Sequence, residues 1–248
     1  MRQQAATPPS MSTSRSEPKT SPVLGLLGGT FDPVHCGHRA LADAALASGA
    51  VGRVRWIPAG QPPHRSGPAA SAEQRLAMVR LMIADQAAFE LDTSEVDAAA
   101  VGAPSYTFDT LQRLRATLGP QQPLALILGA DAFLGLASWH RWPEIPALTH
   151  FLVTSRPGFV LDAASLPDAL QGLWSNARID DPMQLGQSPG GKIFVFAMPP
   201  LELSATALRR RLRECDRSCA RDCNPDATFD GLLSPEVGRY IHHHHLYC

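Results

Sequence analysis

The chain has 248 residues, which is enough for one large α/β domain or two small ones with a sizeable core. Its 22 Lys and Arg residues nearly balance its 23 Asp and Glu residues, and the formal net charge of −1 argues against a surface devoted to polyanions. No run of about eighteen apolar residues occurs, so no transmembrane segment is expected.

Residues 1–21 are rich in Ser, Thr and Pro and contain no apolar segment of the kind found in signal peptides. We therefore expect a disordered N-terminal tail on a cytoplasmic protein, followed by a single domain that spans residues 22–248. The five cysteines form no pattern typical of a disulfide-stabilised fold of this size, so reduced thiols are expected.

Short apolar runs alternate with segments of helical periodicity along this domain. Strands are predicted at 23–27, 54–57, 89–96, 124–128, 151–154 and 193–197. Helices are predicted at 37–47, 71–86, 105–118, 204–214 and 234–244, and Ser71 with Gln74 forms a capping-box pattern at the second. The alternation predicts an α/β fold: a doubly wound, Rossmann-like parallel sheet of five to six strands with helices on both faces.

In such a sheet the loops that follow the strands meet at one edge, where ligands bind. We therefore expect the loops after Leu27, Ile57, Leu128 and Ala197 to converge. The loop at 58–68 is long and rich in Pro and Gly, which favours a functional role over a simple connection.

The first strand ends in the turn GGTFDPVHCGH, residues 28–38. Gly28 and Gly29 allow a ligand to approach the main chain closely, and a helix that starts near Cys36 directs its free N–H groups into the same space. His35 and His38 are three residues apart and share one face of the first helical turn. This combination favours a phosphate site.

The sequence allows two other interpretations of the histidines. Helical zinc pairs are usually spaced i, i+4 with a Glu beside the first His, and that Glu is absent here. The histidines could also be ordinary surface or core residues. The turn has neither the Gly-Lys-Ser/Thr of a P-loop nor a G-x-G-x-x-G pattern, so a phosphate site here needs other cations, which histidines can supply.

A second helix start lies in LSATALRRRL, residues 203–212. Ser204 is a good N-cap residue, Thr206 follows in the first turn, and Arg209 can reach back as a fork-shaped cation. Taken alone, the segment is an ordinary basic helix. Paired with the first turn, it suggests two helix N-termini that hold one polyphosphate.

GGTFDPVHCGH and LSATALR together resemble the HxGH and ISxTxxR motif pair of the nucleotidyltransferase superfamily. Five further stretches resemble bacterial nicotinate-nucleotide adenylyltransferases, in the family's order. They are IPAGQPPHR (57–65), SYTFDTL (105–111), GADAFLGLASWHRWPEI (129–145), SRPG (155–158) and YIHHHHLY (240–247). The resemblance covers the chain from about residue 22 to its end.

This resemblance implies transfer of an adenylyl group from ATP to nicotinate mononucleotide, which gives deamido-NAD and pyrophosphate in NAD biosynthesis. The attacking phosphate oxygen is largely ionised near neutral pH, so positioning and electrostatics suffice without a general base. Mg²⁺ is expected to enter with ATP, bound by phosphates and water. The expected partners are these two small molecules, and binding to nucleic acid or to a membrane is not expected. The protein is expected to be a monomer or a homo-oligomer.

The resemblance also implies roles for individual residues. His35, His38 and Arg209 are expected to be catalytic, because they would bind the ATP phosphates and offset the charge of the leaving pyrophosphate. The other assignments are Gly28, Gly29, Thr30, Phe31, Ser204 and Thr206 to ATP and its phosphates; Gly129 and Asp131 to the ribose; Tyr106, Thr107, Trp139 and His140 to the nicotinate; and His64 and Arg65 to a substrate loop. Position alone leaves Asp131 equally suited to cap a helix, Trp139 to the core, and the two loop residues to solvent.

The chain departs from the family pattern in two places. Ala59-Gly60-Gln61 stands where family members often have an asparagine, which leaves the side-chain contacts of that loop open. Cys215, Cys219 and Cys223 lie in a segment that looks like an insertion; a metal site is conceivable there, but the missing C-x-x-C pair favours free thiols. Residues 242–245, HHHH, continue a helical pattern from Pro235 and are taken as native sequence.

Three rival functions remain open from the sequence alone. A sibling transferase would use phosphopantetheine or nicotinamide mononucleotide, although the pantetheine enzymes usually have Thr in place of His35. A nucleotide-binding regulator would keep the pocket without the chemistry. Nucleic-acid binding through RRRLR (209–213) is disfavoured by the near-neutral charge and the lack of interleaved aromatic residues.

Overall fold

The computed structural model describes residues 22–62, 67–155, 161–199, 203–218 and 231–248, without the side chains of 155 and 215–218. The tail predicted at 1–21 lies outside these ranges. Seven parallel strands form one sheet in the order β3-β2-β1-β4-β5-β7-β6. The strands are β1 (Leu24–Gly29), β2 (Arg53–Pro58), β3 (Phe89–Leu91), β4 (Leu124–Gly129), β5 (His150–Ser155), β6 (Arg178–Ile179) and β7 (Ile193–Ala197).

The α/β parallel sheet is therefore confirmed, with one strand more than the five to six predicted. The additional strand, β6, has two residues and pairs only with β7 at the edge of the sheet. A segment this short carries no periodicity that a sequence pattern can reveal.

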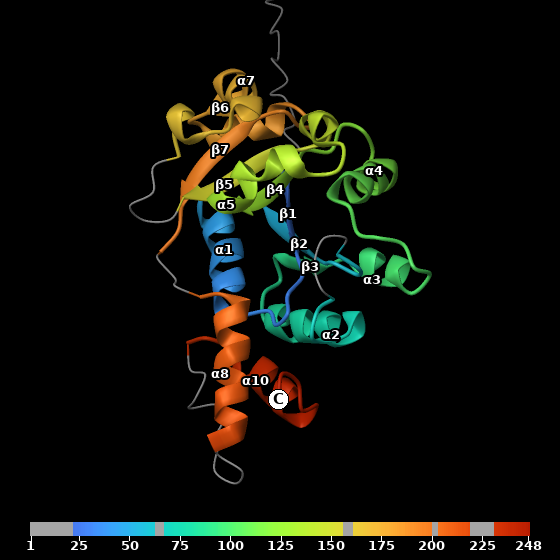
Figure 1. Ribbon diagram of the computed structural model, residues 1–248. Coiled ribbons are helices and arrows are strands. Elements are labelled where there is room, and N and C mark those ends of the chain that lie inside the picture. Colours follow the sequence, from blue (N-terminus) through green and yellow to red (C-terminus); the bar gives the residue numbers. More distant parts are fainter. Residues whose placement is uncertain (1–21, 63–66, 156–160, 200–202, 219–230) are drawn as a thin grey trace, which may run out of the picture.

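Helices cover both faces of the sheet (Figure 1). They are α1 (Cys36–Ala47), α2 (Ala72–Ile83), α3 (Ser94–Ala99), α4 (Thr107–Leu118), α5 (Ala130–Leu134), α6 (Ile145–Leu148), α7 (Asp168–Ala177), α8 (Ala205–Ser218) and α10 (Pro235–His243). Short 3₁₀ helices lie at η1 (Leu136–Ser138), η2 (Trp142–Glu144), η3 (Ala163–Ser165) and η4 (Pro182–Gln187). The capping box predicted for α2 is confirmed, because Ser71 and Gln74 bond to each other's main chain.

One predicted strand, 89–96, was wrong in its second half. β3 ends at Leu91, and α3 begins three residues later at Ser94. The Asp92 carboxylate accepts the Ser94 amide at 3.0 Å, which turns the chain out of the sheet, and Glu95 adds an acidic residue to the first turn of the new helix. Local hydrogen bonding and an acidic first turn therefore end the strand earlier than predicted.

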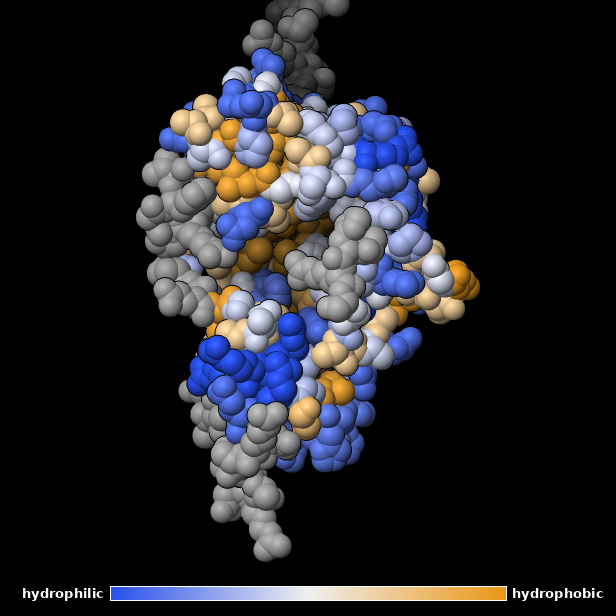
Figure 2. All heavy atoms as spheres, in the orientation of Figure 1, coloured by the Kyte–Doolittle hydropathy of each residue, from blue (hydrophilic) through white to orange (hydrophobic). Residues whose placement is uncertain are grey.

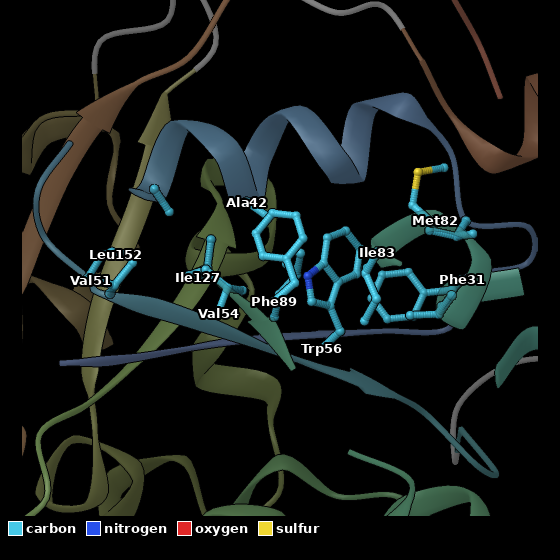
Figure 3. Packing of buried hydrophobic residues seen from close by; sticks show 14 of the residues in the cluster. Phe31, Ala42, Val51, Val54, Trp56, Met82, Ile83, Phe89, Ile127 and Leu152 are labelled. Carbon is cyan, nitrogen blue, oxygen red and sulfur yellow. The ribbon is translucent and has the colours of Figure 1, made fainter. Parts of the chain in front are cut away.

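Apolar side chains on the two faces of the sheet form two cores. In β4, Ala125 and Ile127 belong to the core beneath α1, α2 and α10, whereas the alternating leucines of the same strand join the core beneath α4 to α7. Such a strand is apolar at every position because both faces are covered. Within the first core, Trp56 packs between Phe31 and Phe89, with ring centroids 5.6 and 5.5 Å away (Figure 3).

The order of the strands places a switch point beside β1. From β1 the chain moves to β2 and β3 on one side, and later to β4 and β5 on the other. The loops that follow β1 and β4 therefore diverge from adjacent strands, which opens a space for ligands at their carboxyl ends. Among the described helices none is both long and apolar enough to cross a membrane.

Candidate active site

A cavity of about 210 Å³ lies at the carboxyl ends of β1, β2 and β4. Gly28, Gly29 and Thr30 line it from the turn after β1, and Thr107 and Trp139 line it from the opposite side. Figure 2 shows the molecule hollowed in its middle, with apolar residues at the base and hydrophilic residues below, over α8. Three of the four loops expected to converge thus meet around one cavity.

The glycines in the turn after β1 are required by close packing. A Cβ on Gly29 would lie 2.9 Å from the Phe31 ring, and a Cβ on Gly37 would lie 3.0 Å from His35 Nδ1. Gly28 has no atom near its Cβ direction, so it leaves the cavity wall open. Phe31 has a left-handed φ of 51° and its ring is buried in the core, which leaves only its main-chain groups to meet a ligand.

His35 and His38 form a stacked pair at the start of α1. Their ring centroids are 3.8 Å apart with an interplanar angle of 25°. The His35 amide donates to Nδ1 of His38 at 3.2 Å, so the proton of a neutral His38 ring is on Nε2. Nδ1 of His35 is buried and has no hydrogen-bond partner among the described residues. The pair therefore keeps hydrogen-bonding capacity that the protein does not satisfy.

The surroundings of the pair keep both rings uncharged near neutral pH. Burial lowers the pKa of His35 to about 4, although a hydrogen bond with its own backbone opposes the shift. Burial, and then the proximity of His35, lower the pKa of His38 well below its usual range. The histidines thus offer neutral N–H donors, and a phosphate group beside them would raise both pKa values.

Arg209 brings a distant guanidinium to this turn. Its Nη1 donates to the main-chain oxygen of Asp32 at 2.6 Å, three residues before His35, and lies 3.6 Å from the Asp32 carboxylate. Its Nη2 is 3.4 Å from the Thr206 hydroxyl. Arg209 and Asp32, which are 177 residues apart in the sequence, are therefore in direct contact.

The start of α8 lies against the start of α1. The Cβ of Leu203 is 3.4 Å from the position that a Cβ on Gly37 would occupy. The Ser204 side chain accepts the Ala207 amide at 3.2 Å, as expected of an N-cap residue, and helix geometry leaves earlier amides of that turn without an intrahelical acceptor. At α1, the Cys36 amide is instead occupied by the Leu232 carbonyl. Helix geometry thus makes the first amides of α8 candidates for binding an anion.

The residues assigned to nicotinate gather around the start of α4. Thr107, the first residue of α4, and Trp139 line the cavity, and Trp139 is half-buried at its edge. Tyr106 and the exposed His140 pack on each other with ring centroids 4.5 Å apart. Thr107 and Trp139 therefore reach the cavity, whereas Tyr106 and His140 are not among the residues that line it.

The assigned ribose residues lie at the end of β4. Gly129 is the last residue of the strand and also the N-cap of α5, so Asp131 stands exposed in the first turn and is not the cap residue. His64 and Arg65 lie outside the described residues, as do Cys219 and Cys223. Among the residues that are described, no group of three or more His, Cys, Asp or Glu side chains is placed to hold a metal ion.

Arg75 is a site component that the sequence did not reveal. Its guanidinium is buried in α2 and donates to the carbonyls of Thr30, Ala59 and Gly60 at 2.6, 2.5 and 2.8 Å. Burial lowers its pKa, although Asp32 is the first of several groups that oppose the shift. Arg75 thus ties the turn after β1 to the loop after β2. No helical pattern distinguishes it from a surface arginine.

Glu95 is a second component that was missed, because the sequence placed it in a strand. It lines the cavity from α3 and accepts the Thr110 hydroxyl at 2.5 Å. Burial raises its pKa, and hydrogen bonds from Thr110 and Ser105 oppose that shift. Ser105 Oγ in turn accepts the amides of Gly60 and Gln61. A chain of hydrogen bonds therefore connects the loop after β2 to the start of α4.

Known proteins resemble this chain over most of its length. The family of cytidylyltransferase-like proteins matches residues 26–211. A Dechloromonas aromatica protein named "Probable nicotinate-nucleotide adenylyltransferase" is 51% identical over 92% of this chain and 98% of its own length. A protein of the same name from Stenotrophomonas maltophilia is 43% identical over 89% of this chain and 94% of its own.

The fold has a solved counterpart as well. A structure of Plasmodium falciparum nicotinic acid mononucleotide adenylyltransferase complexed with NaAD superimposes with a TM-score of 0.64 at 17% identity, over 91% of this chain and 97% of that one. At that identity the likeness concerns the fold. On the sequence matches, this chain belongs to the cytidylyltransferase-like family and, within it, to the nicotinate-nucleotide adenylyltransferases.

Proposed function

We propose that the protein transfers the adenylyl group of ATP to nicotinate mononucleotide and releases pyrophosphate. The observation that carries this proposal is the contact of Arg209 with the main chain of Asp32, which puts a permanent cation beside the histidine pair. Two relatives with the name of this activity support it. A phosphate oxygen of the mononucleotide attacks the α-phosphorus of ATP, and the bond from that phosphorus to the bridging oxygen of the β-phosphate breaks.

The residues of the site act on charge and position in this scheme. Arg209 and the start of α8 hold the β- and γ-phosphates, and Nε2–H of His38 donates to a phosphate oxygen near the breaking bond. A neutral imidazole has the advantage that it fits a buried position without the cost of a charge, and its Nε2–H still donates to the oxygen on which anionic charge develops. Proton transfer from the nucleophile is unnecessary, because the phosphate is already ionised.

Recognition of nicotinate belongs to the cavity wall formed by Thr107 and Trp139 in this proposal, whereas His35, His38 and Arg209 are not among the residues that line the cavity. The ring stacks on Trp139, and its carboxylate accepts from the Thr107 hydroxyl and neighbouring amides. Glu95 in the same wall is an acceptor, but hydroxyls of Thr110 and Ser105 already donate to it. The Thr107 hydroxyl and the first amides of α4 are donors, which favours a carboxylate over a carboxamide.

Mg²⁺ is proposed to arrive with ATP, where it would bridge phosphate oxygens and offset their charge. The Asp32 carboxylate is already engaged by amides, a hydroxyl and Arg209, so it is poorly suited to bind the ion. The cytoplasmic location and the state of assembly stay predictions from the sequence.

The proposal is tested by pyrophosphate release with ATP, Mg²⁺ and a panel of acceptors: nicotinate mononucleotide, nicotinamide mononucleotide and phosphopantetheine. We expect the acid to be used best, with deamido-NAD identified by chromatography. His38→Ala serves as the inactive control, and His242→Ala, at the exposed end of α10, serves as the matched control. A preference for the amide or for phosphopantetheine would reject the substrate assignment.

A further inference from the structure

We infer that Tyr247 is a positioning residue of the phosphate site, because its hydroxyl holds the Asp32 carboxylate and thereby keeps Arg209 available for the triphosphate. The inference rests on the proposed function of the site. Tyr247 is 215 residues away from Asp32 in sequence, and its Oη–H donates to Asp32 Oδ1 at 2.8 Å. No substrate contact is assigned to it.

Asp32 is the centre of this arrangement. Its Oδ1 accepts the Ala70 amide at 3.1 Å as well as the Tyr247 hydroxyl, and its Oδ2 accepts the Ala69 amide at 2.9 Å. The carboxylate is 6% exposed, so water contributes little to its solvation. Three protein donors therefore fix the direction in which both carboxylate oxygens point.

This fixed direction determines how Arg209 is held. Nη1 of Arg209 is 3.6 Å from Oδ2, too far for a good hydrogen bond, and instead donates to the main-chain oxygen of Asp32 at 2.6 Å. A carboxylate free to turn would form a two-pronged ion pair with the guanidinium, which is the preferred geometry of such pairs. The Tyr247 hydroxyl opposes that turn. Arg209 thus stays close to Asp32 without being captured by it.

The C-terminal helix α10 positions Tyr247 beside Asp32. α10 packs against α2, and Val237 and Ile241 join the same core as the Tyr247 side chain, which is 7% exposed. Beyond the helix, His245 and Tyr247 have left-handed φ values of 48° and 68°, which such residues adopt only where surrounding contacts compensate. The main chain is bent so that the ring reaches Asp32.

The hydroxyl is protonated and remains a donor near neutral pH. Burial, and then the negative charge of Asp32, raise the pKa of Tyr247. Arg209 and Arg75 oppose this shift from the other side of the carboxylate. Tyr247 therefore cannot become a second anion that would compete with the triphosphate for Arg209.

The test compares Tyr247→Phe with Tyr240→Phe, which removes the same hydroxyl from the same end of the chain, where the ring packs on His244 rather than near Asp32. Because Tyr247 acts on Arg209 only through Asp32, ATP binding should lose part of the free energy of this hydrogen bond, and we expect a roughly three- to tenfold rise in the Kd and KM for ATP in Tyr247→Phe. The KM for the mononucleotide should stay at the wild-type value, and Tyr240→Phe should match wild type in both. A wild-type Kd for ATP in Tyr247→Phe would overturn the inference.

A second experiment, in Arg209→Ala protein, distinguishes a positioning role of Tyr247 from a general loss of protein stability. In Arg209→Ala protein, Tyr247→Phe should cause no further loss of ATP affinity, since the residue through which it acts is gone. An equal loss in both backgrounds would overturn the inference. If Tyr247→Phe does not fold, Asp32→Asn keeps the main-chain acceptor of Arg209 and removes the carboxylate that would capture the guanidinium, so ATP affinity should stay at the wild-type value or rise; a loss of ATP affinity in Asp32→Asn would overturn the inference. Absence of adenylyl transfer in the wild type would reject the proposed function, whereas ATP binding still tests Tyr247.

Discussion

Replacing His35 should change how the stability of the protein depends on pH. Burial lowers the pKa of His35 from 6.5 to about 4 in the folded state. Above pH 6.5 the ring is neutral in both states and the shift has no effect. Between pH 6.5 and 4 the unfolded chain takes up a proton that the folded chain does not, so the free energy of unfolding falls as the pH falls.

The size of the effect follows from the shift. A difference of 2.5 pKa units corresponds to a loss of about 3 kcal/mol between pH 7 and 4, and because His35 is only 6% exposed little of this is screened by water. Burial also lowers the pKa values of His38 and His150, so the wild type as a whole loses more than this. The contribution of His35 is therefore the difference between wild type and His35→Asn.

The assay is urea unfolding at half-unit steps from pH 7 to 4, with His35→Asn beside wild type. His242→Asn is the matched control, because its side chain is exposed and gains no new surroundings on folding. The gap between wild type and His35→Asn should change by about 3 kcal/mol across this range in favour of the variant at low pH. Parallel curves would refute the account of a buried, neutral imidazole.

Three further substitutions test other parts of the site. His38→Ala should lower kcat by about 10²- to 10³-fold while the urea midpoint changes little, because a donor to the reacting phosphate is lost; near-normal turnover would contradict its role. Arg75→Met should lower the free energy of unfolding by about 3–5 kcal/mol, because three buried carbonyls lose their donor. A change below about 1 kcal/mol would show that the loops after β1 and β2 keep their positions without this guanidinium. Glu95→Gln should raise the KM for the mononucleotide but not for ATP, since one of the two carboxylate oxygens that accept from the Ser105 and Thr110 hydroxyls becomes an NH2 donor; a reversed pattern would place Glu95 at the other substrate.

The fold was largely predictable because its signals are local. The apolar run of β4 and the capping box of α2 both depend on neighbouring residues, and both are confirmed. The strand predicted at 89–96 failed in its second half for a local reason as well: the carboxylate of Asp92 accepts the Ser94 amide where the chain leaves the sheet and α3 begins.

The candidate site was predictable only where its residues lie in motifs. The turn after β1 and the start of α8 carry recognisable patterns, and the structure brings them into contact through Arg209. Arg75 and Tyr247 act through contacts that no local pattern encodes, with carbonyls of two loops in one case and with a carboxylate 215 residues away in the other. Such residues become visible only once the chain has folded.

The central claim is that the histidine pair and Arg209 bind one triphosphate. A crystal structure with Mg²⁺ and a non-hydrolysable ATP analogue tests it most directly. We predict that Nε2 of His38 and the guanidinium of Arg209 both lie within hydrogen-bonding distance, about 2.7–3.2 Å, of oxygens of the same triphosphate. A triphosphate bound elsewhere, or held by only one of these groups, would contradict the account.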